Sequence, residues 1–192
     1  GGCHRASTGN ISILVGGNRD AFELALPILK IIGHKIIHVG DIGKASILKV
    51  VTNFLASTHL VAIGEALMVC KKSGIDLEKA FQGIKASSGN SFVHETESQV
   101  ILSGSYNVNF TMDLVCKDVG LFQDLVDTWG IKADLSPLIV DIFRQGRENY
   151  GERSWSTQIV KRIEDKCGEN LRSRGFPEEL IDSEIKKEGI EL

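Results

Sequence analysis

The pattern of apolar positions changes once along the chain, close to residue 40. Before this point two short β-type runs, 11–15 and 35–39, flank an amphipathic segment at 21–32 whose spacing predicts a helix. A strand–helix–strand order is typical of α/β domains. Because two strands are too few for a stable sheet of their own, we expect residues 1–40 to be the end of a domain whose front part lies outside this chain.

After residue 40 the pattern predicts helices only. The longest predicted helix, 44–73, contains no proline and would span about 45 Å at 1.5 Å per residue. Shorter helices are predicted over 77–87, 111–129, 136–150 (with Ser136 as its cap) and 155–166, and a helix or turn over 90–99.

These elements predict a mainly α fold, in which an all-helical domain over 41–168 follows the α/β remnant. The last residues, 169–192, are dense in charge. We expect them to form a charged C-terminal tail, either as a peripheral helix or as a segment that wraps a partner.

Composition excludes several classes of function. The chain has 192 residues, a net charge of −3 and a pI near 6.0, so no basic excess points to nucleic acid. No apolar run approaches the roughly 20 residues of a membrane span. Four cysteines lie far apart without a C-x-x-C pair, which favours free thiols and a cytoplasmic location. His34 and His38 flank and end a predicted strand, so we expect no metal site.

Polar residues follow one edge of the long predicted helix. Ser46, Lys49, Asn53 and Ser57 are spaced by three, four and four residues among apolar neighbours. The lysine stem could extend to water, which is the commoner arrangement. Alternatively, a partly desolvated amine with a lowered pKa could act as a general acid or base, with Asn53 orienting a substrate hydroxyl or the amine.

Two further motifs allow binding of anions. The backbone N–H groups of Gly1 and Gly2, close to Arg5, suit a carboxylate, although the same residues could be an ordinary chain terminus. Lys117, followed by Asp118, could reach the phosphate or ribose of a cofactor, or the pair could belong to a solvated helix face. The glycine fingerprint G-x-G-x-x-G of dinucleotide-binding domains is absent from the chain.

Three stretches, in this order, resemble the β-hydroxyacid dehydrogenases, the family that includes 3-hydroxyisobutyrate dehydrogenase and tartronate semialdehyde reductase. The first stretch is the Gly1-Gly2 segment that ends in Val15-Gly16-Gly17. The second, Gly43 to Asn53, resembles the family pattern G-x-G-x-x-x-K-x-x-x-N. The third is Phe110 with Lys117-Asp118-Val-Gly-Leu121. The resemblance runs from Gly1 to about Cys167. This chain departs from the family pattern at Arg5, where glycine is usual, and at Ala45, which replaces the second glycine of the catalytic motif.

The resemblance implies an oxidoreductase that transfers a hydride between NAD or NADP and a small β-hydroxy acid or its semialdehyde. It implies Lys49 as the general acid or base, Asn53 as its catalytic companion, Gly1, Gly2 and Arg5 as substrate-binding residues, and Lys117 and Phe110 as cofactor-binding residues. It also implies that residues 1–40 end a Rossmann-type domain, that the helical domain forms a homodimer or homotetramer, and that this part of the protein alone is inactive.

Two alternatives stay open. A decarboxylating dehydrogenase of the 6-phosphogluconate type needs a basic cluster for a phosphate, for which Arg5 and Arg153 are the candidates. A non-catalytic helical module for oligomerisation would have no need of an amine in an apolar helix, so Lys49 and Asn53 argue against it.

Overall fold

A computed structural model describes all residues, 1–192. It contains eight α-helices, one 3₁₀ helix and three short strands, so the fold is mainly α as the sequence predicts. The chain forms two compact units, each described here by itself. The first comprises Gly1–Thr52 together with Ile181–Leu192, and the second comprises Asn53–Leu180.

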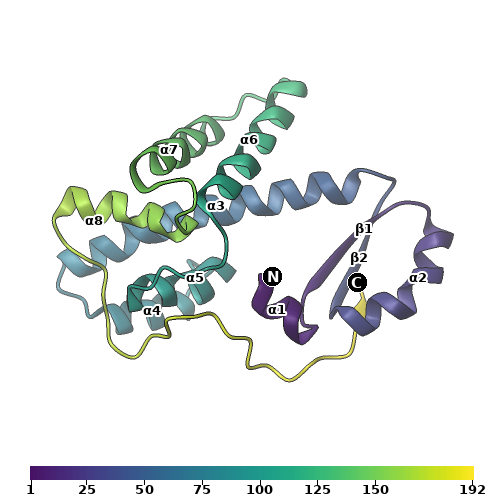
Figure 1. The fold of residues 1–192 in the computed structure, drawn as a ribbon, viewed down its shortest axis with the longest axis horizontal. Helices are drawn as coiled ribbons and strands as arrows, with labels where there is room; N and C mark the ends of the chain where they lie inside the picture. The colour runs from purple at the N-terminus through teal and green to yellow at the C-terminus, as the bar shows by residue number, and fades with distance from the viewer. The chain divides into compact units, whose positions relative to one another are not determined.

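The first unit is the α/β part of the chain (Figure 1). Its elements, in order, are α1 (Cys3–Thr8), β1 (Ser12–Gly16), α2 (Arg19–Ile32), β2 (Lys35–Gly40) and the start of α3 (Lys44–Lys72). Strands β1 and β2 pair in parallel, as a strand–helix–strand unit requires. Helix α2 begins where the Asn18 side chain accepts hydrogen bonds from the backbone N–H groups of Asp20 and Ala21. The predicted strands and helix are therefore confirmed.

A third strand, β3 (Ile190–Glu191), comes from the far end of the chain and lies parallel to β2. The backbone N–H of Ile190 donates to the carbonyl of His34 (2.7 Å), and that of Leu192 donates to the carbonyl of Ile36 (3.0 Å). The prediction that only helices follow residue 40 is therefore wrong. The peripheral helix that was one of the two expectations for the charged tail does not form over 178–187. The edge of β2 offers unpaired backbone groups with which a short segment can pair. Two residues are too few to show the alternation by which a strand is predicted from a sequence.

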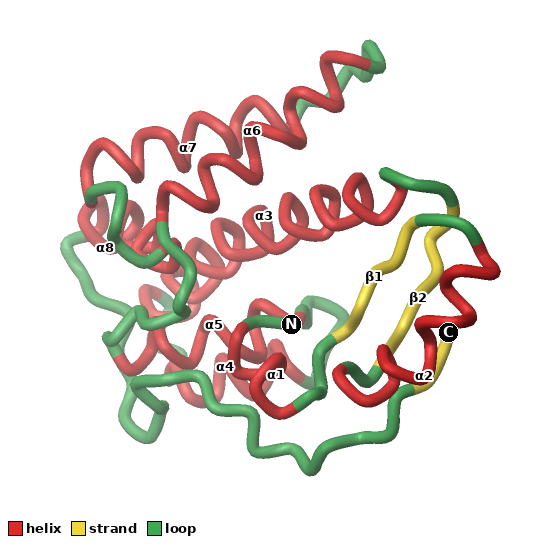
Figure 2. Tube along the Cα trace, turned by 45° about the vertical axis from the view of Figure 1, so that its right-hand side comes forward, coloured by secondary structure: helices red, strands yellow, loops and turns green.

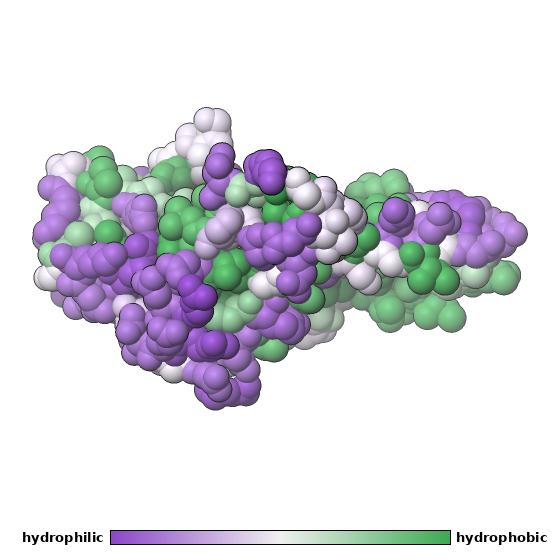
Figure 3. Space-filling model, turned by 90° about the horizontal axis from the view of Figure 1, so that it is seen from above, coloured by the Kyte–Doolittle hydropathy of each residue, from purple (hydrophilic) through white to green (hydrophobic).

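Helix α2 also presents an apolar stripe to solvent. Leu24, Ile28 and Ile31 follow one another at helical spacing and are 84%, 64% and 64% exposed. Figure 3 shows apolar surface in this part of the molecule. A stripe of this kind is typical of a surface that another element or chain covers.

The second unit is entirely helical (Figure 2). It contains the rest of α3, α4 (Leu77–Lys85), α5 (Phe92–Ser103), α6 (Met112–Thr128), α7 (Leu135–Tyr150), a 3₁₀ helix (Ser156–Val160) and α8 (Lys161–Cys167). Helices α6 and α7 pack side by side. The segment over 90–99, for which the sequence allowed a helix or turn, is helical and continues to Ser103.

Two predicted helices differ in detail from those of the structure. Helix α7 begins at Leu135, so Ser136 is inside its first turn rather than at its cap. The Ser136 hydroxyl is buried and donates to the side-chain carbonyl of Gln123 on α6, a tertiary partner that replaces the capping role. The predicted helix over 155–166 is divided into the 3₁₀ helix and α8.

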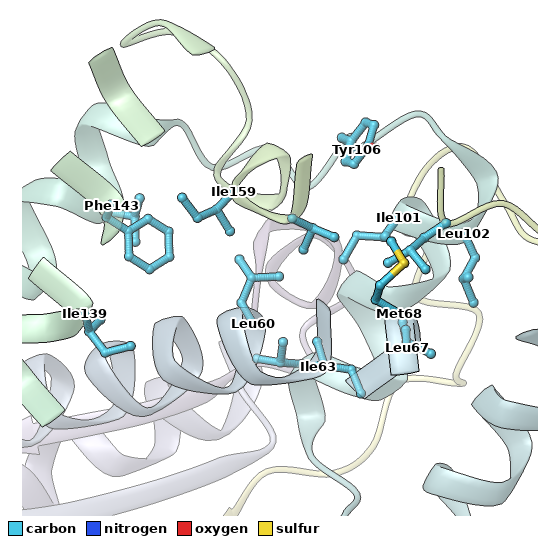
Figure 4. Close-up of a cluster of buried hydrophobic side chains, with 14 of the residues drawn as sticks. Leu60, Ile63, Leu67, Met68, Ile101, Leu102, Tyr106, Ile139, Phe143 and Ile159 are labelled. Carbon is cyan, nitrogen blue, oxygen red and sulfur yellow. The ribbon is translucent and has the colours of Figure 1, made fainter. Parts of the chain in front are cut away.

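The core of the second unit is built around the middle of α3. Figure 4 shows Leu60, Ile63 and Leu67 of this helix facing side chains of α5, α7 and the 3₁₀ helix. A Cβ atom on Gly64 would lie 2.9 Å from a methyl carbon of Val160, so glycine permits this close approach. Burial along α3 begins at Phe54, so the apolar residues of its first turns are only half-buried.

Helix α3 is long and apolar enough to cross a membrane by length and composition alone, whereas the sequence pattern predicts no apolar run of that length. The core helix of a water-soluble protein passes the same test. In this structure α3 buries seven residues, among them Leu60 and Leu67.

Candidate functional site

Lys49 and Asn53 lie one turn apart on α3, which runs unbroken through both positions. The spacing of four residues places them along one edge of the helix. Lys49 is exposed, Asn53 is half-buried, and Ser57, the next residue on this edge, is buried. Lys49 therefore lies outside the buried part of α3, which begins only at Phe54.

In the first unit, positive groups gather around the start of the chain. Lys49 and Arg5 place positive charge near the backbone nitrogen of Gly1. A Cβ atom on Gly1 would lie 3.0 Å from the Cβ of Arg5, so the missing side chain allows this approach. Two positive charges close to one backbone segment favour an anion there.

Arg5, the first departure from the family pattern, has a partner in the structure. Its guanidinium donates to a carboxylate oxygen of Glu184 at 3.2 Å, and both side chains are partly exposed. Ala45, the second departure, lies close to Gly16 at the start of α3. A Cβ on Gly16 would lie 3.3 Å from the Ala45 nitrogen. The two departures therefore lie in the first unit.

In the second unit, two of the predicted site residues meet at one carboxylate. The Asn53 side-chain amide donates to Oδ2 of Asp118, and the Lys117 ammonium lies 2.9 Å from Oδ1 of the same residue. Asp118 is only 8% exposed. The carboxylate therefore links α3 to α6 and fixes the Asn53 amide, since only its NH₂ group can donate.

Sequence reasoning did not select Asp118 as a site residue. The alternative of a solvated helix face is wrong for Asp118, which is buried, although Lys117 is 59% exposed. A signal was available: Asp118 is at helical spacing from Val115 and Phe122, which pack in the core. A carboxylate within an apolar stripe requires partners, and here they are Asn53 and Lys117.

Phe110 lies just before α6 and packs half-buried against the core. Its backbone carbonyl accepts a hydrogen bond from the N–H of Ser156 at 2.8 Å, which holds the segment in place. The structure gives no contact between Phe110 and Lys117, whose exposed ammonium pairs with Asp118.

Comparison with known families identifies the family of this chain. Residues 1–40 match the model of the NAD-binding domain of 6-phosphogluconate dehydrogenase, and residues 43–163 match the model described as NAD-binding of NADP-dependent 3-hydroxyisobutyrate dehydrogenase. Both models describe NAD-binding parts of dehydrogenases. The chain belongs to the β-hydroxyacid dehydrogenase family.

Individual relatives are similar over most of this chain. The 2-(hydroxymethyl)glutarate dehydrogenase of Eubacterium barkeri is 32% identical over 169 residues, which cover 88% of this chain and 56% of that protein. The L-threonate dehydrogenase of Haemophilus influenzae is 28% identical and covers 83% of this chain and 54% of its own length. The chain therefore spans about half the length of the curated relatives it matches.

Two solved structures show the same fold. The 3-hydroxyisobutyrate dehydrogenase of Mycobacterium tuberculosis with L-serine has a TM-score of 0.70 at 26% identity, over 85% of this chain and 58% of that chain. A structure described as Psf3 in complex with NADP⁺ and 2-OPP has a TM-score of 0.76 at 26% identity, over 85% of this chain and 57% of that chain.

Proposed function

We propose that the protein to which this chain belongs transfers a hydride between NAD or NADP and a small β-hydroxy acid or its semialdehyde. The observation that carries the proposal is the hydrogen bond from Asn53 to the buried carboxylate of Asp118, which fixes an amide one turn from Lys49. A helical module that only mediates oligomerisation needs neither the lysine nor the fixed amide.

In the proposed mechanism Lys49 accepts the hydroxyl proton of the substrate during oxidation and returns it during reduction. When bound, the nicotinamide cofactor takes up or supplies the hydride at the carbinol carbon. Asn53 orients the substrate hydroxyl or the amine, and Asp118 holds its amide group in one orientation. Because proton removal prevents a costly alkoxide from forming, we expect Lys49 to contribute the largest part of the rate acceleration.

The remaining residues bind and position. We assign the substrate carboxylate to the backbone of Gly1 and Gly2 with the charge of Arg5 beside them, and the positive charges of Lys49 and Arg5 near the Gly1 nitrogen support this assignment. Lys117 and Phe110 would hold the cofactor, the former by charge and the latter by ring contact.

We further propose a cytoplasmic homodimer or homotetramer with three parts, as the sequence suggests. Residues 1–40 would end the dinucleotide-binding domain, 41–168 would form the substrate and subunit-contact domain, and 169–192 would be the tail. The exposed apolar stripe of α2 supports a further element or subunit packed on residues 1–40.

A turnover assay of the full-length parent protein tests this function. A panel of β-hydroxy acids, phosphorylated sugar acids and unrelated alcohols is offered with NAD and with NADP, and both reduced cofactor and carbon dioxide are measured. Oxidation of hydroxy acids without carbon dioxide is expected. The 192-residue chain alone serves as the negative control, because it has no glycine fingerprint for the cofactor phosphates.

The other results of this assay identify the alternatives. Carbon dioxide release from a phosphorylated acid would establish the decarboxylating reaction. Arg153 gives that reaction little support, since it is 80% exposed and pairs with Asp113. Absence of turnover with every substrate would support the alternative of a non-catalytic helical module for oligomerisation.

A further inference from the structure

The C-terminal segment 181–192 lies along the first unit. Beyond the β3 pairing, the backbone carbonyl of Glu188 lies 2.9 Å from a ring nitrogen of His34, and the Lys186 ammonium donates to the carbonyl of Ile31 at 2.7 Å. A Cβ on Gly189 would lie 2.4 Å from the Lys30 backbone, so the chain approaches the end of α2 closely. Figure 2 shows the C-terminus beside β2 and α2.

The same segment covers Asn10, the second residue after the end of α1. Asn10 is only 4% exposed. Its amide NH₂ donates to Asp182 (2.9 Å) and to the backbone carbonyl of Glu184 (3.3 Å), while its carbonyl accepts from the backbone N–H of Lys187 (3.0 Å). The tail therefore satisfies both polar ends of this buried amide.

Two carboxylates of the tail extend these contacts along α1. Asp182 also accepts a hydrogen bond from the Thr8 hydroxyl, at the last residue of the helix. Glu184 pairs with Arg5 at 3.2 Å, one turn closer to the glycine pair. The bonds from Thr8 and then Asn10 lower the pKa of Asp182 to about 2, so this carboxylate is ionised at neutral pH.

Helix α1 needs such contacts because it has no apolar anchor. It is six residues long and buries none of its side chains, so packing does not fix its orientation. Polar contacts from the tail to Arg5, Thr8 and Asn10 hold α1 in place, as a buried hydrophobic face does for a longer helix.

We propose that residues 181–192 form a brace that positions the substrate-binding segment Gly1–Asn10, with Asp182 and Glu184 as positioning residues for recognition of the substrate carboxylate. Asp182 fixes the end of α1, and Glu184 orients Arg5. The proposal rests on the function proposed above, because that function assigns Gly1, Gly2 and Arg5 to the acid. A purely structural tail, which only covers the edge of β2, would change stability without changing substrate affinity.

The test uses full-length parent protein with Asp182→Asn, Glu184→Gln and a matched control, Glu188→Gln. All three remove one negative charge from the same segment, but the Glu188 side chain is exposed and its backbone carbonyl makes the contact. We expect KM for the hydroxy acid to rise about tenfold in Asp182→Asn and about threefold in Glu184→Gln. In both variants kcat and the cofactor KM should change less than about twofold, and the control should match wild type.

A second readout keeps this test independent of the proposed function. Amide hydrogen exchange over 3–10 should be faster in Asp182→Asn than in Glu188→Gln, because the end of α1 loses its anchor. If the wild-type protein oxidises no hydroxy acid, the proposed function fails and exchange alone decides the brace. Unchanged exchange in Asp182→Asn would overturn the brace, and so would an unchanged KM in an active enzyme.

A double-mutant cycle tests the direct contact. Thr8→Val removes the hydroxyl that donates to Asp182, and Asp182→Ala removes the carboxylate that accepts from it, so their effects on KM, or on exchange where there is no turnover, should not add. Fully additive effects would show that Asp182 does not act through the end of α1.

Discussion

In the first unit, Arg5 and Lys49 bring positive charge together near Gly1 at a partly exposed surface. In the second unit, Asn53 and Lys117 meet at a buried carboxylate, that of Asp118. The positions of the second group follow from helix packing, because Asp118 lies among core residues of α6. Those of the first group depend on polar contacts, several of them made by a segment more than 170 residues away in the sequence. We call the second group the rigid group and the first the held group.

The largest expected effect concerns Lys49. In full-length parent protein Lys49→Ala should lower kcat and kcat/KM alike by about 10²–10⁴-fold, because the general base is lost. Lys49→Arg should not restore the rate, since a guanidinium stays protonated at any working pH. Steady-state kinetics with unchanged cofactor binding would check both variants.

A lysine that only extends its stem to water predicts the opposite for these variants. Lys49 is exposed in this chain, so alanine or arginine would then be tolerated with wild-type kinetics. Near-normal rates in either variant would remove Lys49 from the mechanism and leave the buried carboxylate of the second unit as the remaining candidate.

The second prediction disturbs the rigid group. Asp118→Asn keeps the volume but removes the charge that Asn53 and Lys117 share, so the unfolding free energy should fall by about 1–3 kcal/mol. Because the Asn53 amide loses its fixed orientation, kcat should also fall by about 10–100-fold. Thermal unfolding and kinetics on the full-length protein measure the two effects.

Asp124→Asn is the matched control for Asp118→Asn. Asp124 is an exposed aspartate on the same helix, and the same substitution there should change neither quantity appreciably. Equal effects at the two positions would mean that Asp118 only contributes to the charge of α6.

The hydrophobic pattern predicts the second group better than the first, and the reason is physical. Helix α6 is long, so its apolar period is readable, and Lys117 could be placed on it from the sequence. Helix α1 has six residues and no buried face, and β3 has two residues, so neither has a period to detect. Asp182 and Asn10 meet only after the chain has folded, and no local signal marks them as partners.

The same limit explains the errors within the helical unit. Ser136 followed by proline is a good local signal for a helix start, but the hydroxyl has a stronger partner in Gln123 of α6. Local preference is a weak guide wherever a tertiary contact competes with it. The candidate residues that could be predicted are those that a motif or a helix period identifies.

The third prediction tests the held group through its substrate contact. Arg5→Ala should raise KM for acid substrates about tenfold at little cost in kcat, because a charge-assisted bond contributes about 1.5–3 kcal/mol. Arg153→Ala is the control, since this exposed arginine of the second unit pairs with Asp113. An unchanged KM for every acid would show Arg5 to be an ordinary surface residue, held by Glu184 for stability alone.

The smallest expected effect is an acid sensitivity of the brace. Hydrogen bonds from Thr8 and Asn10 hold the pKa of Asp182 at about 2, below its ordinary value of 3.8. A lowered folded-state pKa stabilises the folded form above the unfolded value, and this contribution is lost as the pH falls through 4 towards 2. The protection factor for exchange of the Leu192 amide, whose N–H donates to Ile36, should therefore fall over this range. The fall should be flatter in Asp182→Asn, which has no proton to take up, and as in wild type in the control Asp20→Asn on α2. Identical pH profiles in wild type and Asp182→Asn would show that the ionised carboxylate does not hold the tail, and the two groups of site residues would then differ in burial but not in how they are supported.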